Sequence, residues 1–212
     1  MVDERATYDA MRFAHDLVEA VVALDMMAAA ELVSLRMMRE WAATRWTARE
    51  PDVPAALSLA SEFSRSPNET RLRLIWVLLA LLPRPVVNCP VYDRQGHLLG
   101  IADLLDVMAG LVVEYDGAEH RRALRQAKDV AKEDRLRRVG LEVARVTGPD
   151  LHHPSVVVDR LVSARARALF EPEADRAWVA RPPTSDLHVR ILARREHEAW
   201  LEHVHGLTVA DW

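Results

Sequence analysis

The sequence has one cysteine, no long hydrophobic run and no excess of positive charge, and each absence excludes a class of protein. Because Cys89 stands alone, it cannot form an internal disulfide, and no Cys/His cluster has the spacing of a zinc site. The longest apolar run, 74–82, is far shorter than the roughly 20 residues that span a bilayer. The first residues, Met1–Arg5, include two acids where a signal peptide carries positive charge. We therefore expect a cytoplasmic protein with no membrane partner.

The charge balance excludes a generally basic nucleic-acid-binding protein, because the formal net charge is −4. A local basic face stays compatible with this total, since association depends on where the charges lie. The chain has 212 residues, 50% of them hydrophobic, which suffices for one sizeable domain or for a domain with helical additions.

The N-terminal part, residues 1–64, has the pattern of a helical segment. Apolar residues recur at helical spacing, so we expect helix over 7–46 and a shorter helix through Leu57 and Ala60. Methionines 26, 27, 37 and 38 continue the apolar pattern, and we interpret them as core residues rather than as a binding site. The stretch 64–67, Ser-Arg-Ser-Pro, marks the boundary.

Residues 65–170 alternate between helix and strand patterns. We expect helix over 67–82, strands over 86–92, 98–105 and 111–115, a polar helix over 119–138, a strand over 141–146 and a helix over 154–170. This order predicts an α/β fold, with a small mixed sheet flanked by helices. Residues 171–212 form a C-terminal extension with a helix expected over 185–203.

Two acids, Glu114 and Asp116, stand at the end of the third expected strand. Side chains alternate across a strand, so both acids project from one face while Val113 and Tyr115 point into a core. Two carboxylates close together resist burial unless a cation joins them, and Mg²⁺ prefers such oxygen ligands. A structural alternative is that Asp116 forms an Asp-Gly turn while Glu114 pairs with an arginine.

Asp103 interrupts the apolar run of the preceding strand, and a charge at such a position is seldom buried without a partner. If residues 106–110 form the turn of a hairpin, Asp103 and Glu114 come close together. Three carboxylates then surround one point, which favours a metal site over three separate solvated acids.

Two further residues, Glu69 and His120, allow both a catalytic and a structural interpretation. Ser66, Pro67 and Glu69 form a capping box, which needs no catalytic role to explain it. His120 can act as a general base beside a metal-bound phosphate, or it can be an ordinary polar residue at a helix start.

The helix expected over 119–138 is rich in basic residues and follows the acids directly. A charged helix is usually a solvated face, but this placement favours contacts with phosphates. The candidate nucleic-acid-binding residues are Arg121, Arg125, Lys128 and Lys132.

Several of these motifs together resemble a known family. They are Ser-Pro-x-Glu-Thr-Arg-Leu-Arg from Ser66, an Asp in a strand, Glu-Tyr-Asp-Gly-x-x-His from Glu114, and a helix ending Leu-x-x-x-Gly before Val-x-Arg-Val-Thr. Over about 66–151 the chain is similar to actinobacterial endonuclease-domain proteins of unknown function. These resemble very-short-patch-repair endonucleases of the PD-(D/E)XK restriction-endonuclease-like superfamily. Residues 7–62 also look like the helical segment that often precedes this domain.

The resemblance implies a restriction-endonuclease-like core and assigns roles to individual residues. Asp103 corresponds to the principal metal ligand, and Glu114 to the acid of the (D/E)XK motif. Asp116 stands where the superfamily has its lysine, so the positive charge has to come from elsewhere, with Lys128 and Lys132 as candidates. The other implied positions are Glu69 on the first helix, His120 as the family histidine, Asp129 on the following helix, and Arg145 and Thr147 in the last core strand.

The leading functional expectation is an endonuclease that hydrolyses phosphodiester bonds in DNA with Mg²⁺ or Mn²⁺, in repair or defence. One alternative is a catalytically inactive module that binds nucleic acid or belongs to a toxin–antitoxin system. Another is an interaction protein that binds a partner, or a second copy of itself, through its Met-rich N-terminal helices.

Overall fold

The structure is a computed structural model that describes residues 2–44, 52–117 and 123–205, apart from the side chains of residues 123–129, 202, 204 and 205. The chain divides into two compact units, Met1–Glu62 with Thr184–Trp212, and Phe63–Pro183. These units differ from the three expected segments. Residues 171–183 belong to the second unit, whereas the C-terminal helix belongs with the N-terminal helices. None of the helices in the described part is long and apolar enough to cross a membrane.

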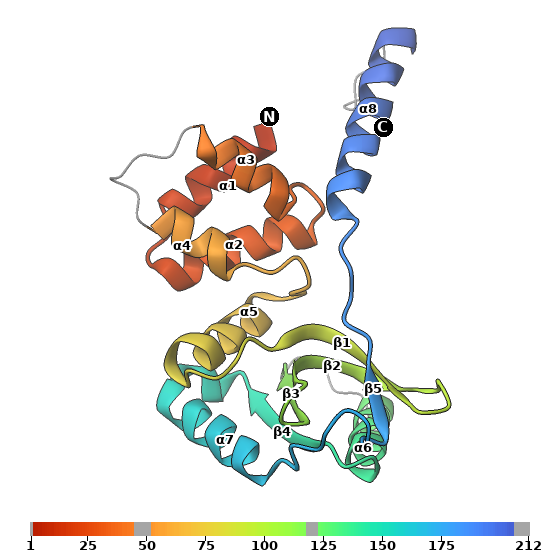
Figure 1. The fold of residues 1–212 in the computed structure, drawn as a ribbon. Coiled ribbons are helices and arrows are strands. Elements are labelled where there is room, and N and C mark those ends of the chain that lie inside the picture. The colour runs from red at the N-terminus through yellow and green to blue at the C-terminus, as the bar shows by residue number, and fades with distance from the viewer. Residues whose placement is uncertain (1, 45–51, 118–122, 206–212) are drawn as a thin grey trace. The chain divides into compact units, whose positions relative to one another are not determined.

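The first unit is entirely helical in its described part (Figure 1). Its helices are α1 (Val2–Arg12), α2 (Leu17–Ala29), α3 (Leu35–Ala43), α4 (Asp52–Leu59) and α8 (Leu187–His205).

The continuous helix expected over 7–46 is wrong, because polar caps begin a new helix at two points. Asp16 accepts a hydrogen bond from the backbone N–H of Glu19 at 2.9 Å, and Ser34 accepts one from Met37 at 3.1 Å. Such side chains satisfy N–H groups that a helix start leaves open, so the chain turns there at low cost.

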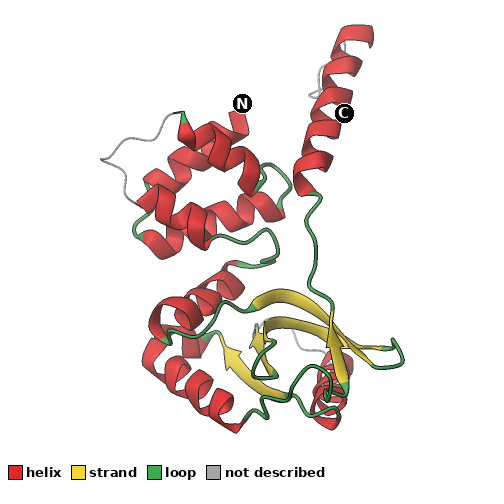
Figure 2. Ribbon diagram, viewed as in Figure 1, coloured by secondary structure: helices red, strands yellow, loops and turns green. Residues whose placement is uncertain are grey.

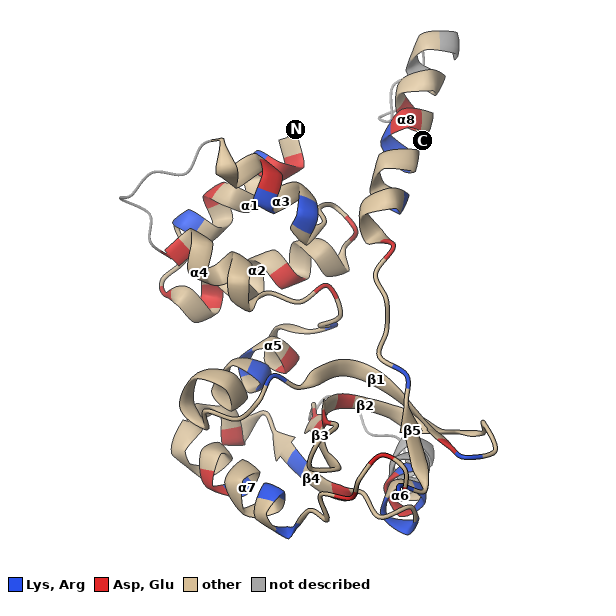
Figure 3. Ribbon diagram, viewed as in Figure 1, with Lys and Arg blue, Asp and Glu red and all other residues tan. Residues whose placement is uncertain are grey.

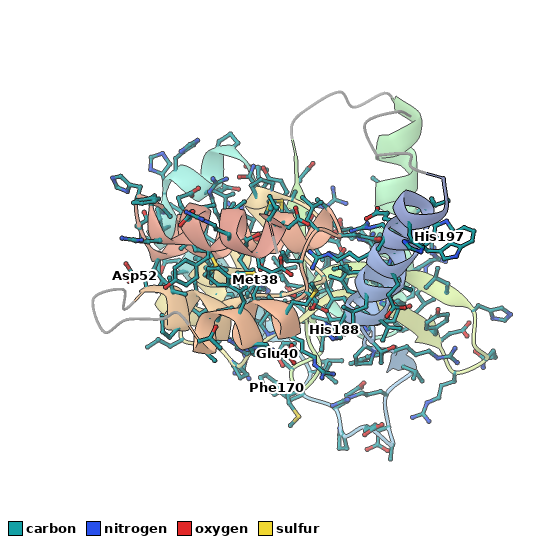
Figure 4. All side chains as sticks on the ribbon, turned by 90° about the horizontal axis from the view of Figure 1, so that it is seen from above. Met38, Glu40, Asp52, Phe170, His188 and His197 are labelled. Carbon is teal, nitrogen blue, oxygen red and sulfur yellow. The ribbon has the colours of Figure 1, made fainter. Side chains whose placement is uncertain are left out.

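The four methionines of α2 and α3 are buried to different degrees. Met37 and Met38 of α3 are buried, and Met26 and Met27 of α2 are partly buried. On α8, His188 lies 3.0 Å from the Ser34 hydroxyl (Figure 4 labels His188 and Met38).

The second unit contains a five-stranded mixed sheet flanked by helices (Figure 2). Its elements are α5 (Pro67–Leu74), the π-helical η1 (Ile75–Leu79), β1 (Val86–Asp93), β2 (Leu98–Asp106), β3 (Leu111–Asp116), α6 (Ala123–Arg138), β4 (Glu142–Thr147), the 3₁₀ turn η2 (Pro149–His152), α7 (Pro154–Arg167) and β5 (Trp178–Ala180). The expected mixed α/β architecture is confirmed, and the first residues of the polar helix, 119–122, lie outside the described part.

The sheet has the strand order β4-β3-β2-β1-β5. All neighbouring strands are antiparallel except β3 and β4, which are parallel and are joined through α6. One face packs on η1 and α7 through Trp76, Val113 and Leu161. The other face packs on α6 through Val112 and Leu136. Because successive side chains of β3 point to opposite faces, Glu114 lies on the α6 face.

The strand β5 was not expected from the sequence. It has three residues and pairs with the outer edge of β1 from Val91 to Asp93. Three residues are too few to show an alternation of apolar and polar side chains, so the sequence pattern does not predict this strand. Its anchor is tertiary, because the buried Trp178 packs in the α6-side core with the Arg176 guanidinium 4.9 Å from its ring centroid.

The turn between β2 and β3 is held by Asp106, which is only 3% exposed. One of its carboxylate oxygens accepts hydrogen bonds from the N–H groups of Met108 and Ala109, both at 3.0 Å. The other lies 2.8 Å from Nε of Arg165 on α7. Asp106 therefore fixes the hairpin that brings the two acid-bearing strands together.

Substituting Asp106 tests this anchor. We expect Asp106→Ala to lower the free energy of unfolding by about 3 kcal/mol, because Arg165 and two turn N–H groups lose a buried partner. Asp106→Asn is the control, since its amide oxygen can keep the turn bonds, and it should lose clearly less. Urea unfolding measures both. Equal midpoints for wild type and Asp106→Ala would contradict the assignment.

Candidate active site

Asp103 and Glu114 lie opposite each other on neighbouring strands. In the β2–β3 ladder Leu104 pairs with Val113, so the next step of the antiparallel register brings Asp103 against Glu114. An oxygen of the Asp103 carboxylate accepts a hydrogen bond from the backbone N–H of Tyr115 at 2.8 Å. The hairpin expected around residues 106–110 is thus confirmed, and with it the proximity of these two acids.

The surroundings of Asp103 raise its pKa from 3.8 to about 7. Burial is the largest cause, and the neighbouring charge of Glu114 adds to it. The Tyr115 N–H and the ammonium of Lys132 lower the pKa, while Glu69 raises it. Asp103 is therefore a carboxylate whose negative charge the protein only partly offsets.

Glu69 combines the expected helix cap with a place beside Asp103. Ser66 begins α5 and accepts a hydrogen bond from the Glu69 N–H at 3.2 Å. The Glu69 carboxylate accepts from the Arg65 N–H and from the Asn88 amide, both at 3.0 Å. The capping role is confirmed. The Asn88 amide also joins this helix start to β1, and the charge of Glu69 makes a small contribution to the raised pKa of Asp103.

Asn88 connects Glu69 to the sheet, and the sequence analysis did not identify it. It lies between Val87 and Cys89, which pair with Leu104 and Ala102, so it faces Asp103 across β1 and β2. Its φ of 47° is left-handed, a conformation that asparagine tolerates better than most residues. Its amide donates to the Phe63 carbonyl at 2.7 Å as well as to Glu69. The sequence did contain a signal for Asn88, because it is a polar residue inside an otherwise apolar strand.

Lys132 of α6 places a cation beside the acids. Its Nζ lies 2.5 Å from an oxygen of Glu114, and the two side chains are only 22% and 18% exposed. This is one of the two lysines considered as a replacement for the missing strand lysine. Glu114 therefore forms an ion pair with a lysine of α6.

Asp116 borders a pocket between α6 and the adjoining strands β3 and β4. Arg145 of β4 also borders it and pairs with Glu133 of α6 at 2.8 Å. The pocket is lined by Glu114, Tyr115, Asp116, Lys132, Glu133, Leu136, Val143 and Arg145. Thr147, at the end of β4, donates its hydroxyl to Asp150 at 2.8 Å and has a structural role there.

The other predicted site residues cannot be placed in this cluster. His120 and Arg121 lie outside the described residues. Arg125, Lys128 and Asp129 belong to α6, but their side chains lie outside the described part. Farther along α6, Arg135 and Arg137 make backbone contacts within the unit, to the carbonyls of Leu99 and Val143. Figure 3 shows Lys and Arg, in blue, on the part of α6 that is not grey.

The donor chemistry of the cluster fits a divalent cation held by two carboxylates. Among the described residues, no three His, Cys, Asp or Glu side chains form a group that could hold a metal ion. Mg²⁺ is commonly bound by one or two carboxylates, with water and substrate phosphate as the other ligands. Asp103 and Glu114 supply that smaller set.

Comparisons with known proteins identify no relative: no family model, curated protein or solved structure matched the chain.

The raised pKa of Asp103 predicts how stability depends on pH. Between about pH 4 and pH 7 the folded state retains a proton that the unfolded state releases, so stability falls as pH rises through this window. Asp103→Asn carries no such proton and should lose less stability over the same window. Urea unfolding at pH 4.5 and 7.5 for both proteins measures the difference. Parallel pH profiles would show that Asp103 titrates normally.

Proposed function

We propose that the second unit is a divalent-metal-dependent endonuclease that hydrolyses phosphodiester bonds in DNA, with Asp103 and Glu114 as the metal ligands and Mg²⁺ or Mn²⁺ as the metal. The observation that carries this proposal is the apposition of Asp103 and Glu114 on neighbouring strands, together with the incompletely offset charge of Asp103. The restriction-endonuclease-like identity of the fold and the choice of DNA rest on the motifs described above.

The protein's own residues prepare a site for a cation. The Tyr115 N–H orients the Asp103 carboxylate, and Glu69 adds negative potential from the start of α5. Placing carboxylates together without full compensation disfavours their ionised forms, and a bound cation reverses that preference. A divalent ion held by Asp103 and Glu114 would supply Lewis-acid stabilisation of the phosphate and lower the pKa of water.

Lys132 provides the positive charge that Asp116 cannot. Its ammonium lies against Glu114, where a phosphate oxygen or the attacking water would also approach. In hydrolysis, water attacks phosphorus, one P–O bond breaks and the departing oxygen takes up a proton. An ammonium held in place can stabilise the developing negative charge and keep the water oriented. We assign this role to Lys132, with His120 as a candidate for proton transfer.

Cleavage of DNA by the purified full-length chain tests the proposal. We expect cleavage with Mg²⁺ or Mn²⁺, and a chelator should abolish it. Asp103→Ala should lower the cleavage rate by at least about 100-fold, because mutating even the partner of a metal ligand can cost that much. Asp159→Ala, which removes an exposed acid from α7 of the same unit, is the matched control and should cleave like wild type. Equal activity of Asp103→Ala and wild type would contradict the assignment of Asp103 as a metal ligand. Salt-sensitive DNA binding without turnover would favour the inactive binding module.

Removing the charge of Lys132 tests its assigned role. We expect Lys132→Met to slow cleavage by about 100-fold, comparable to the loss of one positioned donor that stabilises developing charge, because the methionine keeps most of the stem without the ammonium. The affinity for DNA should change far less, since one of many basic residues is lost. Single-turnover cleavage and a binding titration separate the two quantities. A drop in affinity with an unchanged cleavage rate would instead make Lys132 a DNA-binding residue.

A further inference from the structure

Lysine is rare in this protein, and one of its lysines lies in the acidic cluster. Of the 28 lysines and arginines in the chain, only Lys128 and Lys132 are lysines. Among the described side chains of the second unit, arginine forms the ion pairs with Asp106, Asp150 and Glu142. The use of a lysine next to Glu114 is therefore unusual for this sequence.

The stem of Lys132 passes directly over Gly100 in β2. A methyl group at Gly100 would lie 2.9 Å from Cγ and 3.0 Å from Cε of Lys132, closer than such atoms approach one another. Cγ is near the backbone and not at the mobile end of the side chain, so Lys132 could not accommodate the methyl by a small terminal movement. A glycine inside a strand weakens the strand, and it often marks a close approach by another group. Here that group is the lysine stem.

The contacts on either side of Lys132 fix α6 over this glycine. Val91 pairs with Gly100 and Tyr92 pairs with Leu98, so the β1–β2 ladder skips Leu99. The Leu99 carbonyl accepts a hydrogen bond from Nε of Arg135 at 3.0 Å. Leu136 is fully buried in the core on this face of the sheet. Residues 132, 135 and 136 thus all contact the sheet, and the path of Lys132 follows from how α6 docks.

We propose that Gly100 is a positioning residue, which leaves room for the stem of Lys132 and thereby holds its ammonium beside Glu114. The relevance of this arrangement to catalysis rests on the proposed nuclease function, whereas the arrangement itself does not. Lysine suits the path better than arginine, because four methylenes are narrow and end in a compact ammonium, while guanidinium is broad and planar.

Reductive methylation with ¹³C-formaldehyde tests the arrangement in the full-length chain. The chain has only two lysine amines besides its terminal amine, so each gives a separate methyl signal, and the signal missing in Lys132→Arg identifies Lys132. In the wild type Lys132 should react slowly because it is paired and mostly buried. In Gly100→Ala it should react several-fold faster, while the terminal amine reacts at an unchanged rate. An unchanged Lys132 rate would overturn the proposal.

A double-mutant cycle covers the possibility that Gly100→Ala folds poorly. Lys132→Ala removes the stem, so Gly100→Ala should lower the melting temperature in the wild-type background and have little effect in the Lys132→Ala background. An equal loss in both backgrounds would show that the methyl group collides with something else, and would overturn the proposal.

DNA cleavage separates this inference from the proposed function. If the wild type cleaves, Gly100→Ala should reduce kcat several-fold with little change in KM, and an unchanged kcat would overturn the positioning role. If the wild type does not cleave under any metal condition while Gly100→Ala still exposes the Lys132 amine, the nuclease assignment fails and the placement of Lys132 by Gly100 stands.

Discussion

Repulsion among carboxylates in a partly buried place is the constraint on which the second unit depends. Burial of Asp103 is the largest cause of its raised pKa, and the charges of Glu114, which it faces, and of Glu69 add to it. Burying like charges costs stability unless donors or cations face them. The contacts around the cluster are such donors: the Tyr115 N–H on Asp103, the Asn88 amide on Glu69 and the Lys132 ammonium on Glu114. Each comes from a different element, so the cluster ties β1, β3 and α6 together.

Other structural features of the unit keep these elements in register. The Asp106 carboxylate closes the turn between β2 and β3, and a slip of one residue there would move Glu114 to the opposite face. Side chains cover the outer edge of β4, the last strand on that side of the sheet. Arg137 and Arg160 donate hydrogen bonds to the backbone carbonyls of Val143 and Arg145. This edge therefore offers few open backbone groups to another chain, as edge strands in native proteins usually do. Arg137 and Arg160 thus bind the backbone of β4, while Lys132 binds Glu114 in the acidic cluster.

The sequence predicts the parts of this arrangement that depend on local chemistry and periodicity. The hairpin follows from two apolar strands around residues 106–110, and it suffices to bring Asp103 to Glu114. The Ser66–Glu69 cap is likewise readable from spacing. The path of Lys132 over Gly100 cannot be predicted from the sequence, because it depends on how far α6 lies from β2. The hydrogen bond from Asn88 to Glu69 joins strand β1 to the start of α5, and no periodicity in the sequence reveals it. In the first unit, Asp16 and Ser34 divide a continuous apolar pattern into separate helices, since capping outweighs periodicity there.

The position of Lys132 also bears on the aspartate at position 116. A lysine on β3 at that position would project from the same face as Glu114 and place a second cation on the α6 side of the sheet. That side already has Lys132 against Glu114 and Arg145 against Glu133. With the helix lysine in place, an acid at position 116 keeps the pocket from accumulating positive charge, and the nuclease that we propose needs no strand lysine. In the function and arrangement that we propose, the aspartate at position 116 and the glycine at position 100 both follow from one feature: the ammonium reaches the acids from α6 and not from β3.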